Sequence, residues 1–102
     1  MTWDMNALER KARDFLDVRK FDAAREVYLV MGDGDPSLDA GYLGHRIGTT
    51  YEAEGRLMEA KYWYNRALEE NPEIPAYQDA AARFRGYFPE SVRLILGDSL
   101  TD

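Results

Sequence analysis

The chain has 102 residues, which is the length of one domain with a modest core. Its formal charge of −6 argues against nucleic acid or an anionic membrane as the main partner, because both attract basic surfaces. It has no cysteine, and no window approaches the run of about 18 apolar residues that a membrane span needs. The first residues also lack a signal-peptide pattern, so we expect a cytoplasmic protein.

The first two predicted helices form a pair. Thr2 or Asp4 can cap the first helix, whose apolar residues recur at helical spacing: Met5, Leu8, Ala12, Phe15 and Leu16. After a turn at residues 18–20, a second helix runs from about Phe21 to Met31. Residues 32–34 (Gly-Asp-Gly) end it, because glycine readily adopts the positive φ of a helix exit.

A second pair follows. The third helix is predicted to start within residues 35–37 and to reach about Glu54, with Pro36 in its first turn, where a missing N–H costs nothing. A fourth helix runs from the break at Gly55 to the stop at residues 71–72 (Asn-Pro). Eight residues follow a pattern of small, aromatic, turn and closing positions: Gly48, Tyr51, Gly55, Leu57, Ala60, Tyr64, Ala67 and Pro72.

With these eight residues, the stretch 48–72 resembles a tetratricopeptide repeat. Trp63, Tyr64 and Ala67 also fit Sel1-like repeats, a related family of helix pairs, whereas residues 71–73 favour the tetratricopeptide form. The first pair repeats this pattern 36 residues earlier, and the offset aligns Ala12 with Gly48, Phe15 with Tyr51, Ala24 with Ala60 and Tyr28 with Tyr64. We therefore place repeat one at about 5–38 and repeat two at about 39–74.

A fifth helix after Pro75 begins a third repeat, which Phe88-Pro89 interrupts. We predict that residues 75–97 cap the stack, with a short sixth helix from about Glu90 to Leu96, and that the tail 98–102 is frayed. The predicted fold is a single all-α domain of residues 1–102. It is an α-solenoid fragment of two tetratricopeptide-like hairpins plus a C-terminal capping helix and a short sixth helix.

The residues needed for catalysis are not grouped in this sequence, so we expect no enzyme, no cofactor and no metal site. Residues 32–35 (Gly-Asp-Gly-Asp) resemble the start of a calcium loop, but residues 40–42 (Ala-Gly-Tyr) stand where its bidentate glutamate belongs. We interpret this segment as a helix–helix turn. His45 could serve as a base or ligand, although a lone histidine on a helix is more often a surface or groove residue.

In tetratricopeptide solenoids the first helix of each pair lines a concave surface, and the resemblance implies which residues face a partner. The candidate contacts are Asn6, Glu9, Arg13, Tyr42, His45, Thr49 and Arg85. Glu9 and Thr49 stand where members of the family that grip a terminal carboxylate have basic or amide side chains, so such a clamp is disfavoured. The alternative for every candidate is an ordinary solvated helix face.

Three glycines line one side of the predicted third helix, at spacings of three and four: Gly41, Gly44 and Gly48. Each costs about 0.5–1 kcal/mol relative to alanine, so something must approach closely. The repeat explains Gly48 but not Gly44. Either a ring such as Trp63 fills the space from a neighbouring helix, or a partner or second copy docks at Gly41 and Gly44.

The sequence thus predicts an adaptor that binds a peptide segment or helix of another protein through the concave face. Two alternatives stay open. One is a self-assembling unit, forming a homodimer or larger oligomer, which would compensate for having fewer than three complete repeats. The other is an acidic regulatory or inhibitor subunit that covers a basic site on an enzyme.

Overall fold

The structure is a computed structural model, and it describes residues 4–89. In this range the chain is all-helical and has no strand: the helices are α1 (Met5–Asp17), α2 (Phe21–Met31), α3 (Tyr42–Ala53), α4 (Leu57–Glu70) and α5 (Pro75–Arg83). The predicted sixth helix, the frayed tail and Thr2 as a possible cap all lie outside the described residues. Among the described helices, none has both the length and the apolar character needed to cross a bilayer.

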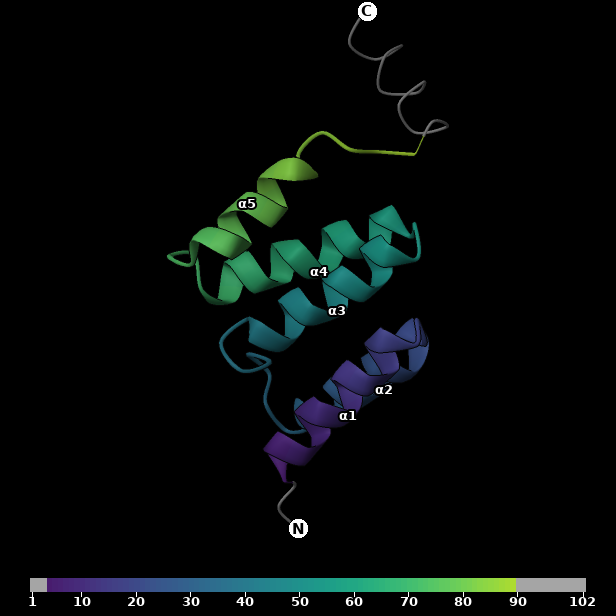
Figure 1. Ribbon diagram of the computed structural model, residues 1–102. Coiled ribbons are helices and arrows are strands. Elements are labelled where there is room, and N and C mark those ends of the chain that lie inside the picture. The colour runs from purple at the N-terminus through teal and green to yellow at the C-terminus, as the bar shows by residue number, and fades with distance from the viewer. Residues whose placement is uncertain (1–3, 90–102) are drawn as a thin grey trace, which may run out of the picture.

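The helices pack in chain order (Figure 1). α1 lies against α2, α3 against α4, and these two pairs meet where α2 contacts α3. α5 then packs against α4, so that successive layers follow the chain from purple to yellow in Figure 1.

Asp4 starts α1 by accepting a hydrogen bond from the backbone N–H of Ala7. The two pairs of helices are then joined internally by turns of the same kind. Arg19, in the turn after α1, has φ of 60°, and Gly55, in the turn after α3, has φ of 77°. These two residues are 36 positions apart, so the predicted repeat pairs two left-handed residues although only one of them is glycine.

The predicted start of the third helix at residues 35–37 is wrong, because α3 begins at Tyr42. The Asp35 carboxylate accepts hydrogen bonds from the backbone N–H of both Ser37 and Asp39, which closes a local turn. The hydroxyl of Ser37 also donates to it, and this bond lowers the pKa of Asp35. Residues 38–40 and Gly41 then have positive φ, from 51° to 91°, so a right-handed helix cannot pass through them.

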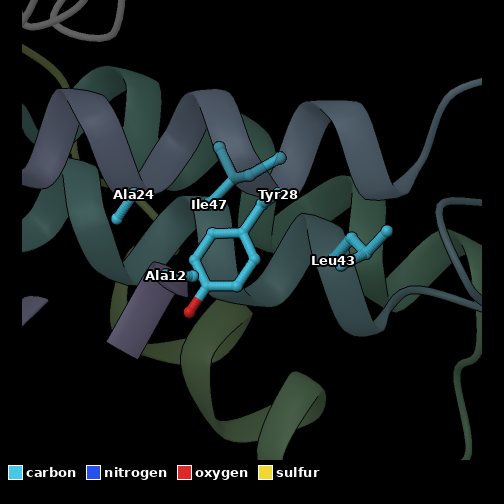
Figure 2. Packing of buried hydrophobic residues seen from close by; sticks show 5 residues of the cluster. All are labelled: Ala12, Ala24, Tyr28, Leu43 and Ile47. Atoms are coloured by element: carbon cyan, nitrogen blue, oxygen red, sulfur yellow. The ribbon is translucent and has the colours of Figure 1, made fainter. Parts of the chain in front are cut away.

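Two groups of buried side chains form the core. The first joins α1, α2 and α3 and consists of Ala12, Ala24, Tyr28, Leu43 and Ile47, with the ring of Tyr28 in the middle (Figure 2). The second joins α4 to α5 and consists of Ala60, Tyr64, Ala80 and Phe84. In three of the pairs aligned by the offset of 36 (12 with 48, 24 with 60, 28 with 64), both residues are buried.

A buried cation links the two hairpins. Arg25 on α2 is only 7% exposed and forms an ion pair with Glu54, directly after α3. Its Nη1 also donates to the hydroxyl of Thr50 over 3.2 Å, and its guanidinium lies 4.0 Å from the ring centroid of Tyr51. These contacts satisfy a charge that burial alone would make costly.

Candidate functional site

Three of the predicted contact residues come together where α1 lies beside the start of α3. The Tyr42 hydroxyl donates to Oε1 of Glu9 over 2.7 Å, and Nε of Arg13 lies 3.8 Å from the same oxygen. Arg46, one turn after Tyr42, donates from Nε to the Tyr42 hydroxyl oxygen over 3.3 Å. We call Glu9, Arg13, Tyr42 and Arg46 the polar cluster.

Arg46 is the member of the polar cluster that the sequence analysis missed. Arg46 is four residues after Tyr42, which places both on one side of a helix, and this spacing could have indicated Arg46 from the sequence. The guanidinium lies 5.5 Å from the centroid of the Tyr42 ring, and within residues 4–89 it takes part in no ion pair. The hydrogen bond with Tyr42 raises the pKa of Arg46, and no carboxylate of residues 4–89 pairs with its two terminal NH₂ groups.

The charges of the polar cluster shift the pKa of the nearby Tyr28 hydroxyl. Burial raises the pKa of its hydroxyl, the Arg46 guanidinium lowers it, and Glu9 raises it. The side chain is 1% exposed, and its hydroxyl oxygen has no hydrogen-bond partner among the described residues. Such a buried polar atom requires an explanation, because nearly all of them are hydrogen-bonded in folded proteins.

His45 is half-buried between two tyrosine rings. Its ring centroid lies 5.4 Å from that of Tyr64 and 5.2 Å from that of Tyr77. Burial lowers the pKa of His45, and the nearby cations Arg46 and Arg83 lower it further. The neutral imidazole is therefore the form that this environment favours.

Because the pKa of His45 is lowered in the folded chain, we expect the protein to lose stability in mild acid. Its pKa is lower in the folded chain than in the unfolded one, so below about pH 6.5 the unfolded chain binds the extra proton. We expect the free energy of unfolding, measured with urea, to fall between pH 7.5 and pH 5.5. His45→Phe keeps a ring in the stack but cannot titrate, so it should flatten this dependence. An equal fall in wild type and variant would contradict the assignment to His45.

Beyond His45, a second set of polar contacts joins α3 to α5. Arg83 donates from Nη1 and Nη2 to the two carboxylate oxygens of Glu52, over 2.8 Å and 3.2 Å, and the Tyr64 hydroxyl donates to Oε1 over 2.6 Å. The hydrogen bonds from Arg83 lower the pKa of Glu52 most, and the hydrogen bond from Tyr64 lowers it further. Because all three groups are paired, this set stabilises the packing of α5 and offers less to a ligand than the polar cluster does.

Among residues 4–89, the remaining candidate contacts form no hydrogen bond with a side chain of the polar cluster. Thr49 donates its hydroxyl to the carbonyl of Arg46 over 2.6 Å, and Asn6 is exposed in the first turn of α1. Arg85 is exposed beside a hollow between α4 and α5, lined by Lys61, Asn65, Leu68, Ala81 and Gly86. It therefore faces the α4 side of α5.

Gly41 and Gly44 are both buried against α4. A Cβ on Gly41 would lie 2.7 Å from the carbonyl oxygen of Ala67, and one on Gly44 would lie 3.6 Å from the carbonyl oxygen of Trp63. Beside Gly44 the backbone of α4 fills the space, and the expected ring of Trp63 does not. Beside Gly41 the backbone of α4 is joined by an aromatic ring of a neighbouring helix, since Cε2 of Tyr77 would lie 3.0 Å from that Cβ. This placement favours internal packing over docking of a second chain, the other alternative for these two glycines.

Within the described part of the chain, no three acidic or histidine side chains gather as a metal site would require. No protein-family model, no curated protein and no solved structure matches the sequence or the structure. Of the two sets of polar contacts, the polar cluster of α1 and α3 is the one with an arginine, Arg46, that forms no ion pair within residues 4–89.

Proposed function

We propose that this protein is a tetratricopeptide-like adaptor, an α-solenoid fragment that binds a peptide segment or helix of another protein. The binding surface is the side of α1 and α3 that carries the polar cluster, which would be the concave face of such a solenoid. On this proposal the protein acts in the cytoplasm by binding and without catalysis. The succession of helix pairs and the burial of residues 36 positions apart support it.

The observation that carries the proposal is the state of Arg46. Its Nε donates to the hydroxyl of Tyr42, which restricts the side chain, while the terminal NH₂ groups are not engaged by a carboxylate of residues 4–89. An arginine held in this way has already lost much of the side-chain entropy that binding costs. A peptide carbonyl or carboxylate that accepts from it gains a charge-assisted hydrogen bond.

The other members of the polar cluster would orient a bound peptide. Glu9 and Arg13 carry opposite charges on α1, and Tyr42 joins them to α3, so a ligand across both helices meets donors and acceptors in a fixed order.

Affinity capture with the intact protein, followed by calorimetric titration of the captured partner, tests this function. Arg46→Glu is expected to weaken binding by at least tenfold. The substitution removes a charge-assisted donor and introduces a negative charge, which repels a carboxylate of the ligand. Tyr42→Ala should weaken it too, because it releases both Glu9 and Arg46.

Arg85→Glu is the matched control, because it makes the same charge change on an exposed arginine on the α4 side of α5. Its affinity should stay within about twofold of wild type. Equal losses for Arg46→Glu and Arg85→Glu would indicate a general charge effect and would reject the α1–α3 surface.

A further inference from the structure

The outer side of the first hairpin carries an apolar groove between α1 and α2. The groove has a volume of about 260 Å³ and is lined by Leu8, Phe15, Ala23, Glu26, Val27 and Val30. Val30, in the last turn of α2, is 39% exposed. We call this surface the N-terminal groove.

The repeat indicates what kind of surface the N-terminal groove is. Phe15 and Val27 correspond, 36 residues later, to Tyr51 and Trp63. In the second hairpin those two residues pack against the core of the first, so they form the contact between layers. The α1–α2 layer has the α3–α4 layer on one side only (Figure 1), which leaves its other side, with the N-terminal groove, without a further hairpin among the described residues. The groove is therefore a stacking surface for another pair of helices.

The opposite end of the described stack does not match this groove. The exposed residues of α5 include Gln78, Asp79 and Arg83, which would enter an apolar groove as polar or charged groups. A head-to-tail contact between copies is thus disfavoured. Such a contact would also leave a free end at each step and form open fibres.

The groove is, however, complementary to itself. Lys11 lies between Leu8 and Phe15 in sequence and on the same side of α1, with Nζ 4.9 Å from the centroid of the Phe15 ring. Glu26 lies on the α2 side of the groove. Neither takes part in an ion pair between residues 4 and 89.

A twofold rotation about an axis along the groove places α1 of one copy over α2 of the other. Lys11 and Glu26 sit at similar heights, since each is about six residues from the connecting turn. The rotation keeps each residue at its distance from the connecting turn, so it brings Lys11 of each copy to Glu26 of the other. It likewise sets Phe15 against Ala23 and Val30 against Leu8 across the contact. The four helices form an antiparallel bundle, a common way to bury such faces.

We propose that two copies of this chain associate through the N-terminal groove, as a closed dimer with two Lys11–Glu26 pairs. This surface is distinct from the polar cluster, so the dimer does not depend on the proposed function, and binding of a partner at α1 and α3 can fail while the dimer holds. Sedimentation equilibrium of the intact protein should give a dimer at tens of micromolar. A monomer at 100 μM would overturn the proposal.

Val30→Glu should weaken the dimer by at least a hundredfold, because it places two carboxylates inside the apolar contact. Leu29→Glu is the matched control, since Leu29 is the next residue on α2, is 47% exposed and does not line the groove. It should leave the mass unchanged. Circular dichroism checks that both variants keep their helices, and equal dissociation of the two variants would reject the groove.

A charge exchange tests the twofold arrangement itself. Lys11→Glu should weaken the dimer by about tenfold, because two attractive pairs become two repulsive ones. Adding Glu26→Lys should restore the affinity to within about threefold of wild type. Without this restoration, the arrangement that pairs Lys11 with Glu26 is wrong.

Discussion

Gly48→Ala is expected to lower the free energy of unfolding by about 2 kcal/mol, and with it the thermal midpoint by about 8–16 °C. A Cβ on Gly48 would lie 2.6 Å from Cε1 and 2.7 Å from Cδ1 of Tyr64. The ring cannot move aside easily, because Tyr64 is 1% exposed and its hydroxyl is bonded to Glu52. The substitution therefore separates α3 from α4.

Gly44→Ala on the same helix is the matched control. A Cβ there meets its nearest atoms at 3.6–3.8 Å, which is ordinary contact. Since alanine favours a helix by about 1 kcal/mol over glycine, this variant should be as stable as wild type or slightly more stable. Thermal unfolding followed by circular dichroism compares the two, and equal losses would contradict the close contact assigned to Gly48 alone.

The ion pair of Arg25 and Glu54 should respond unequally to loss of its two members. Glu54→Ala is expected to lower the free energy of unfolding by about 3 kcal/mol, because it leaves a buried guanidinium without its counter-charge. Arg25→Met should cost less, about 1–2 kcal/mol, because methionine fills similar space and Glu54 can turn to water. The exposures of the two side chains, 8% for Arg25 and 28% for Glu54, set this order.

The double variant, Arg25→Met with Glu54→Ala, should be more stable than the sum of the single losses predicts, since no charge is then left alone. Urea unfolding of all four proteins measures the difference. Additive losses, or a larger loss for Arg25→Met than for Glu54→Ala, would show that Arg25 contributes mainly through its stacking on Tyr51.

The helices could be predicted from sequence because local signals define them. The apolar spacing of α1 and the turn glycine Gly55 depend on residues within a few positions, and the structure confirms the elements that they predict. The connection before α3 could not be predicted in this way. Pro36 suits a helix start, but the bonds of Asp35 with Ser37 and Asp39 close a turn first.

The candidate site was only partly predictable, for a related reason. The resemblance to a tetratricopeptide repeat implies that Glu9, Arg13 and Tyr42 share one surface, and the structure brings them into contact. Partners of a charged side chain on another helix cannot be read in this way. Arg25 and Glu54 are 29 residues apart, and Arg83 and Glu52 are 31 apart, so only the packed helices show these pairs.

The connection between the hairpins has an energetic consequence. Leu38, Asp39 and Ala40 all have left-handed backbones, and each costs roughly 1 kcal/mol because an L-residue crowds its own carbonyl there. Docking of the second hairpin on the first and the local hydrogen bonds of Asp35 together hold these backbones, so part of the free energy gained by docking offsets the strain. Cohesion between the two layers is therefore weaker than their shared core alone would provide, whereas each layer closes through a short turn of its own.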